Sequence, residues 1–178
     1  GVSVGNKLDI EKNESLKDAL EESDIDYIVE AALDMGDEEN DIITLNFNSF
    51  DDMLSEAVGE IQAVSNISMI LKSENINALS SAMRIYNGKP LINSVNGTEE
   101  SMNAVLPLVK KYGGIVVGLT LDEGGIPETA EGRFAVAEKI VKLYHEDIIE
   151  ASYDGEVDDL IDELEEEFEE YDDADTKI

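Results

Sequence analysis

Amide and carboxylate side chains follow several short apolar runs of this chain, at positions where they could bind a ligand. Asn93 and Asn96 lie within Ile-Asn-Ser-Val-Asn-Gly, and Asp122 follows the run Gly-Ile-Val-Val-Gly-Leu-Thr-Leu. An amide both donates and accepts hydrogen bonds, whereas an ionised carboxylate only accepts them. The alternative is structural, because asparagine at a strand end also bonds its own backbone in a turn. Asp122 could equally favour the next helix through the helix dipole.

The elements that would position these residues follow from the hydrophobic pattern. Two apolar runs, 90–95 and 114–121, flank a helical segment of roughly fifteen residues, which is the βαβ pattern of a parallel sheet. The carboxyl ends of parallel strands meet at one edge, where α/β folds place their ligands. We therefore expect parallel strands, adjacent in chain order with helices packed outside, at 42–47, 67–71, 90–95 and 114–121.

Weaker signals extend this pattern to about six βα units. Residues 2–5 predict a short strand, and residues 15–33 a helix that breaks near Ser23-Asp24, where Asp24 can cap the second piece. A sixth strand is expected at 148–153. Further helices are predicted at 51–64, 75–86 and 127–144.

The composition changes near residue 155, so we expect an α/β domain over 1–154 and an acidic amphipathic helix and tail over 155–178. Apolar residues recur at helical spacing in this otherwise acidic segment, at Val157, Leu160, Ile161, Leu164 and Phe168. Two interpretations stay open. The apolar stripe docks on the domain while the carboxylates face water, or it binds a partner.

Charge and composition exclude several classes of protein. The net charge of -31 comes from 43 acidic and 12 basic residues, which argues against binding nucleic acid or an anionic membrane. No cysteine is present and His145 is the single histidine, so a metal site built on cysteine or on several histidines is excluded. No apolar run approaches the roughly 20 residues that a membrane span needs.

Three segments in combination resemble a known family. They are Asn-Gly-Lys-Pro-Leu-Ile-Asn-Ser-Val-Asn-Gly, Lys-Lys-Tyr-Gly-Gly-Ile-Val-Val-Gly-Leu-Thr-Leu-Asp-Glu, and Gly-Ile-Pro-Glu-Thr-Ala-Glu-Gly-Arg, which together span 87–133. They are similar to the pterin-binding domain of cobalamin-dependent methionine synthase and of methyltetrahydrofolate:corrinoid protein methyltransferases. The similarity is close over 64–143 and looser over 15–63.

This resemblance implies a fold of parallel βα repeats that is TIM-barrel-like but short. The family barrel has eight strands and typically about 250 residues, so about two βα units are missing and the barrel would be partial or open. Three explanations stay open. The chain is a fragment, another chain supplies the missing strands, or the sheet has become open.

The resemblance also implies methyl transfer from methyltetrahydrofolate to the cobalamin of a corrinoid partner protein or domain, in the cytoplasm and with no metal of the chain's own. Asn93 corresponds to the family asparagine near N5 of the pterin and is the candidate catalytic residue. The remaining candidates would bind the substrate. They are Asn46, Asn96, Asp122, Lys72 and Glu74.

Lys72 departs from the family pattern. It stands where the family has a strand-end aspartate, and a lysine has no acceptor for the N–H donors of the pterin. Glu74 would have to replace that carboxylate. We therefore expect the chain to bind methyltetrahydrofolate weakly or not at all, with negligible methyl transfer. The alternative function is a non-catalytic module, either a degenerate pterin binder or an acidic interaction module, and a homodimer is compatible with either.

Overall fold

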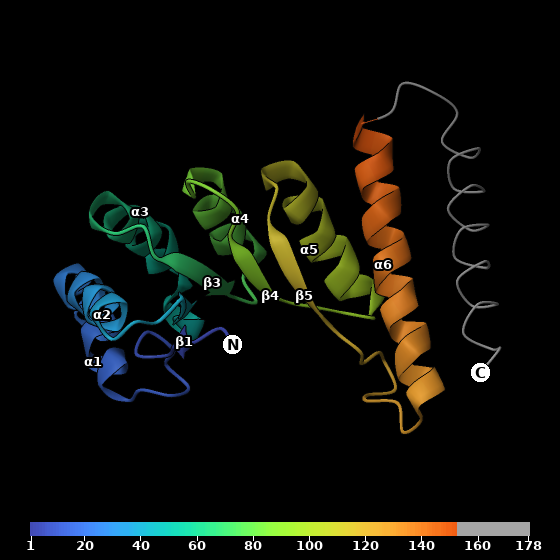
Figure 1. Ribbon diagram of the computed structural model, residues 1–178, viewed down its shortest axis with the longest axis horizontal. Coiled ribbons are helices and arrows are strands. Elements are labelled where there is room, and N and C mark those ends of the chain that lie inside the picture. The colour runs from blue at the N-terminus through green and yellow to red at the C-terminus, as the bar shows by residue number, and fades with distance from the viewer. Residues whose placement is uncertain (153–178) are drawn as a thin grey trace.

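The computed structural model describes residues 1–152, and these residues form one parallel sheet with helices between successive strands (Figure 1). The strands are adjacent in chain order, and every neighbouring pair is parallel. This confirms the predicted order and direction. The strands are β1 (Val4–Gly5), β2 (Ile42–Asn46), β3 (Ser68–Lys72), β4 (Leu91–Asn96) and β5 (Ile115–Leu119).

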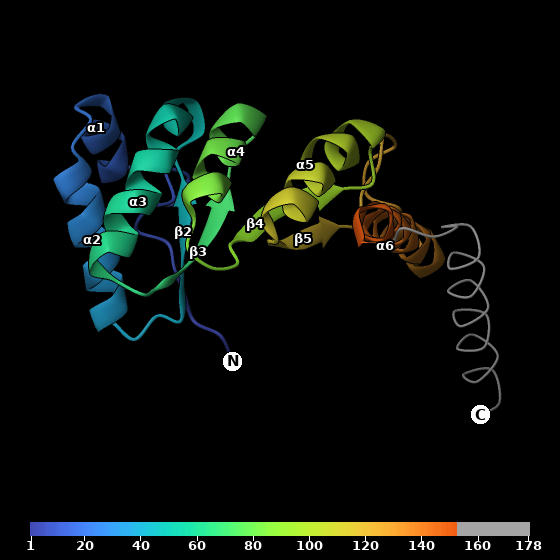
Figure 2. The same ribbon diagram turned by 90° about the horizontal axis from the view of Figure 1, so that it is seen from above.

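The helices lie along one face of the sheet, and no described helix covers the other face (Figure 2). The first connection contains two helices, and a 3-10 helix precedes α3. The result is an open α/β sheet, consistent with part of a TIM-barrel-like fold. The helices are α1 (Ser15–Glu21), α2 (Ile25–Asp37), η1 (Asn48–Met53), α3 (Leu54–Val64), α4 (Ile76–Ile85), α5 (Glu99–Tyr112) and α6 (Ala130–Ser152).

The core lies between the sheet and the helices. Successive side chains of a strand point to opposite faces, and in β2 the fully buried Ile43 and Leu45 belong to this core. From α3 the core receives Leu54, Val58 and Ile61, which are buried at helical spacing. The alternate strand positions therefore point to the face without helices, where polar residues such as Asn46 lie.

Local signals set the helix boundaries as the sequence indicates. The Asp24 carboxylate accepts a hydrogen bond of 3.0 Å from the Tyr27 backbone N–H and caps α2, which confirms the predicted break between two helices. Thr98 caps α5 in the same way through the Ser101 N–H. At its other end α5 stops at Gly113, whose φ of 76° is left-handed and suits glycine.

The predicted sixth strand is wrong. Residues 148–152 belong to α6, which runs to Ser152, and the last residue of that predicted strand lies outside the described residues. The cause is that the segment from 133 to 152 contains no glycine or proline to end the helix, and a short apolar pair fits a helix as well as a strand. The predicted acidic helix at 155–171 also lies outside the described residues.

Candidate functional site

The carboxyl end of β2 is tied to the loop that follows β1. Asn46 is only 4 % exposed, and its Nδ2 donates a hydrogen bond of 2.8 Å to Oδ1 of Asp9, which is 6 % exposed. The Asn46 backbone also accepts from the Ile10 N–H at 3.0 Å and donates to the Leu8 carbonyl at 3.0 Å. A buried carboxylate needs such donors, so this pair fixes an acidic group at the ligand edge of the sheet.

Lys72 ends β3 directly beside Asn46, since the two residues are partners in the parallel register. Its Nζ lies 2.7 Å from Oε2 of Glu11, in the same loop as Asp9. A hydrogen bond and the positive charge of Lys72 hold the pKa of Glu11 below its ordinary value. Asp9 Oδ1 also accepts from the Glu11 N–H at 3.0 Å. Two carboxylates, those of Asp9 and Glu11, therefore lie at the strand edge beside Lys72.

Asn93 lies on β4, next to this cluster in the sheet. Leu71 of β3 pairs with Ile92 of β4, and Lys72 and Asn93 are the residues that directly follow this pair. Ile92 is 1 % exposed and belongs to the core on the helix side; Asn93 consequently points to the face without helices. Its side chain is half-buried and makes no hydrogen bond within the described residues. The amide is thus available to a ligand.

Asn96 is the last residue of β4, and Asp122 lies in the segment after β5. The side chains of both residues accept hydrogen bonds from nearby backbone N–H groups. Asn96 Oδ1 accepts from the Thr98 N–H at 2.9 Å, and Asp122 Oδ1 accepts from the Gly124 N–H at 2.8 Å. The two ends are joined by a hydrogen bond of 2.8 Å from the Gly97 N–H to the Leu121 carbonyl. The Asn96 contact is the one that its structural alternative predicts. Asp122 instead bonds within a turn, since the next helix begins only at Ala130. A role for either residue in a ligand site stays a prediction.

Glu74 is exposed, in the loop after β3, and makes no side-chain hydrogen bond within residues 1–152. A different carboxylate, Asp51, is buried near it. Its Oδ2 accepts from the Ser73 hydroxyl at 2.5 Å, while its Oδ1 has no partner in the described part of the chain. Burial raises the pKa of Asp51, against the opposing effect of the Ser73 hydrogen bond.

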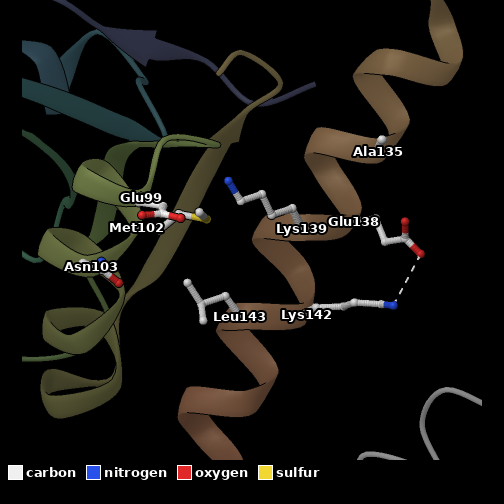
Figure 3. A pocket seen from close by; sticks show the side chains of 8 residues that line it. All are labelled: Glu99, Met102, Asn103, Ala135, Glu138, Lys139, Lys142 and Leu143. Carbon is white, nitrogen blue, oxygen red and sulfur yellow. Dashed lines mark ion pairs between the residues drawn. The ribbon is translucent and has the colours of Figure 1, made fainter. Parts of the chain in front are cut away.

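A separate hollow of about 590 Å³ lies between α5 and α6 (Figure 3). Glu99 and Met102 reach it from α5, and Lys139 and Leu143 from α6. The Lys139 ammonium donates a hydrogen bond of 2.9 Å to the Gly97 carbonyl, so it ties α6 to the loop after β4. This hollow belongs to the helix layer and not to the strand edge that carries Asn46, Lys72 and Asn93.

The sheet therefore brings the candidates into two groups along one edge. Asn46, Lys72 and Asn93 form the first group, and the second contains Asn96 and Asp122. The sequence reasoning missed Asp9 and Glu11, although they follow the weakly predicted first strand and carboxylates after a strand are a usable signal. Within residues 1–152 no group of three histidine, cysteine or acidic residues could hold a metal ion. No described helix is long and apolar enough to span a bilayer.

Comparison with known proteins finds sequence similarity over about half of the chain. The chain is 34 % identical over 88 residues to methionine synthase of Mycobacterium leprae (strain TN). This chain therefore contains a region that is similar in sequence to part of a methionine synthase. The match covers 47 % of the chain and 7 % of the relative, so the chain corresponds to a small part of that protein. No protein-family model matches the chain.

Proposed function

We propose that this chain is a methyl-transfer-related domain that binds the pterin of methyltetrahydrofolate at the carboxyl ends of its strands. The observation that carries the proposal is the 34 % identity to methionine synthase. The open parallel sheet supports it, since polar side chains from β2, β3 and β4 gather at the edge where such folds bind ligands.

Asn93 is the proposed catalytic residue. Transfer of the methyl group from N5 requires that N5 become a better leaving group, so a group near N5 must stabilise its protonated state in the transition state. The Asn93 amide can serve this purpose because it both donates and accepts. Its half-buried side chain has no hydrogen-bond partner within residues 1–152, unlike that of Asn46. Such a free amide on the open face of the sheet supports a ligand contact.

We propose that Asp9 or Glu11 supplies the carboxylate that the family has at the position of Lys72. A carboxylate is the natural partner for the N–H donors of the pterin edge. Both residues lie at the same strand edge as Lys72, but Glu11 is paired with the lysine and Asp9 with Asn46. We therefore infer that a binding site is formed but partly blocked by its own ion pair, which gives weak affinity.

The proposed methyl acceptor rests on the same similarity to methionine synthase. A corrinoid protein or domain would present its cobalamin, which supplies the nucleophile, at this edge of the sheet. The residues of this chain would then bind and orient the folate and stabilise N5. Such a domain would work in the cytoplasm, where a folate-dependent methyltransferase meets its substrate.

Titration calorimetry with methyltetrahydrofolate tests the proposal. The unmodified chain should bind weakly, and Lys72→Asp should tighten binding about tenfold or more, because one recovered contact of about 1.4 kcal/mol is worth a factor of ten. Lys89→Asp, the same charge change on an exposed residue before β4, should change nothing. Micromolar binding by the unmodified chain with no gain from Lys72→Asp would contradict the inferred role of Lys72.

A non-catalytic module is the second candidate. It is favoured by the engagement of Asn46 and Lys72 in contacts within the protein, at 2.8 Å and 2.7 Å respectively. If neither the unmodified chain nor Lys72→Asp binds methyltetrahydrofolate at millimolar concentration, this second function replaces the first.

A further inference from the structure

An apolar groove runs between β5 and α6. It has a volume of about 370 Å³, and no charged side chain lines it. Several of its walls are open to solvent, with Ile115 56 % exposed and Val141 41 % exposed. The lining residues are Ile115, Val116, Gly118 and Thr120 from the strand side and Ala137, Ile140, Val141 and Tyr144 from α6.

The groove adjoins the edge of the described sheet. β5 is the last strand in the order and pairs only with β4 among residues 1–152. Its sequence, Ile-Val-Val-Gly-Leu, contains no charge or proline, which are the usual means of protecting an edge strand from other chains. Covering the edge with a helix or loop is another common solution. A helix packed in the groove would bury its exposed apolar side chains beside this edge.

The chain itself continues from a suitable point. α6 begins at Ala130, after the loop that follows β5, and runs beside the sheet to Ser152 (Figure 1). The sequence continues after it with 26 residues, 153–178. Within 155–171 the apolar residues recur at helical spacing, and every charged residue is acidic. Two residues, 153 and 154, suffice to connect antiparallel helices, for which connections of two to five residues are usual.

We propose that residues 155–171 occupy this groove as a helix antiparallel to α6. At a rise of about 1.5 Å per residue, a helix that returns after two connecting residues brings Leu164 to the level of Tyr144 and Phe168 to the level of Ile140. Both of these α6 residues line the groove. The apolar stripe and the groove thus match in length and in chemistry.

The charge pattern makes this helix depend on the groove. Like charges three or four residues apart destabilise an isolated helix, and short helices in water are marginal even without repulsion. The acidic residues between the apolar positions would face water, since the groove itself offers no charge. Packing of the stripe is then the interaction that supports the helix.

The test uses a single tryptophan, because the full chain contains none. Phe168→Trp in the full chain should give a blue-shifted emission and low quenching by acrylamide. Glu166→Trp, on the opposite side of the predicted helix, should emit and quench like a tryptophan in water. Equal exposure of the two tryptophans to acrylamide would overturn the proposal. This comparison does not require any change to the groove itself.

A groove variant then identifies the site. Val141→Asp should expose the Phe168→Trp indole, whereas Val64→Asp, the same change at a residue of α3 that is 58 % exposed, should leave it protected. Circular dichroism checks that both variants stay folded. The proposal is overturned if both changes have the same effect, or if protection is lost on dilution, because the occupant would then be a second copy of the chain.

Discussion

The buried pair formed by Asn46 and Asp9 offers the sharpest test of how the site is built. Replacing Asn46 with alanine removes the donor that lies 2.8 Å from the Asp9 carboxylate, 37 residues away along the chain. Both side chains are more than nine-tenths buried. After the change, Asp9 Oδ1 keeps the Glu11 N–H as a donor, but it loses its partner from β2.

The magnitude follows from the type of bond. A hydrogen bond to a charged group contributes about 1.5–3 kcal/mol, and leaving a buried acceptor short of a donor adds to the cost. We expect Asn46→Ala to lower the free energy of unfolding by about 2–3 kcal/mol. For a domain of this size that corresponds to a fall in Tm of roughly 5–10 °C.

Urea denaturation of Asn46→Ala, Asp9→Ala and the double variant measures the pair as a double-mutant cycle. The matched control is Asn77→Ala, on an exposed position of α4, which should stay within about 0.5 kcal/mol of the parent. The reasoning is refuted if Asn46→Ala behaves like this control, or if the effects of Asn46→Ala and Asp9→Ala simply add.

Two further predictions concern neighbouring parts of the strand edge. Burial raises the pKa of Asp51 above its ordinary value near 3.8, so the folded state binds the proton of this carboxyl group more tightly than the unfolded state does. The folded state therefore loses stability as the pH rises from the ordinary pKa through the raised pKa. Asp51→Asn should therefore stabilise the protein at pH 7 and have little effect at pH 3, measured by urea denaturation at both; a larger gain at pH 3 would contradict this sign. Gly97→Ala would place a methyl group 2.5 Å from Val136 Cγ1 and 3.0 Å from the Leu121 carbonyl oxygen, and should cost about 1–3 kcal/mol in the same assay. An unchanged stability would show that α6 does not pack on this loop.

The sheet could be predicted from the sequence because each strand is a short apolar run between polar or glycine-containing turns. The runs 42–47, 67–71, 90–95 and 114–121 correspond to β2 to β5 within about two residues at each end. A parallel sheet then requires the carboxyl ends to share an edge. The prediction of a strand at 148–153 was wrong because two adjacent isoleucines do not show the alternation that distinguishes a strand from a helix. The helix that begins before them continues without interruption to Ser152.

The contacts within the site could not be predicted in the same way. Glu11 and Lys72 are 61 residues apart in sequence, and nothing local pairs them. The loop after β1 becomes part of the strand edge only because Asp9 and Ile10 bond to the end of β2. Asn96 illustrates the converse, as its local turn contact with Thr98 is the one that a strand-end asparagine predicts from sequence alone.

The central claim is that the strand edge binds methyltetrahydrofolate through the Asn93 amide. Calorimetric titration of methyltetrahydrofolate into Lys72→Asp and into Lys72→Asp combined with Asn93→Ala tests this claim most directly, with Lys72→Asp combined with Asn77→Ala as the control. The account predicts that the Asn93 change removes the binding gained by Lys72→Asp, whereas the Asn77 change leaves it intact. Equal affinity of all three variants for methyltetrahydrofolate would contradict it.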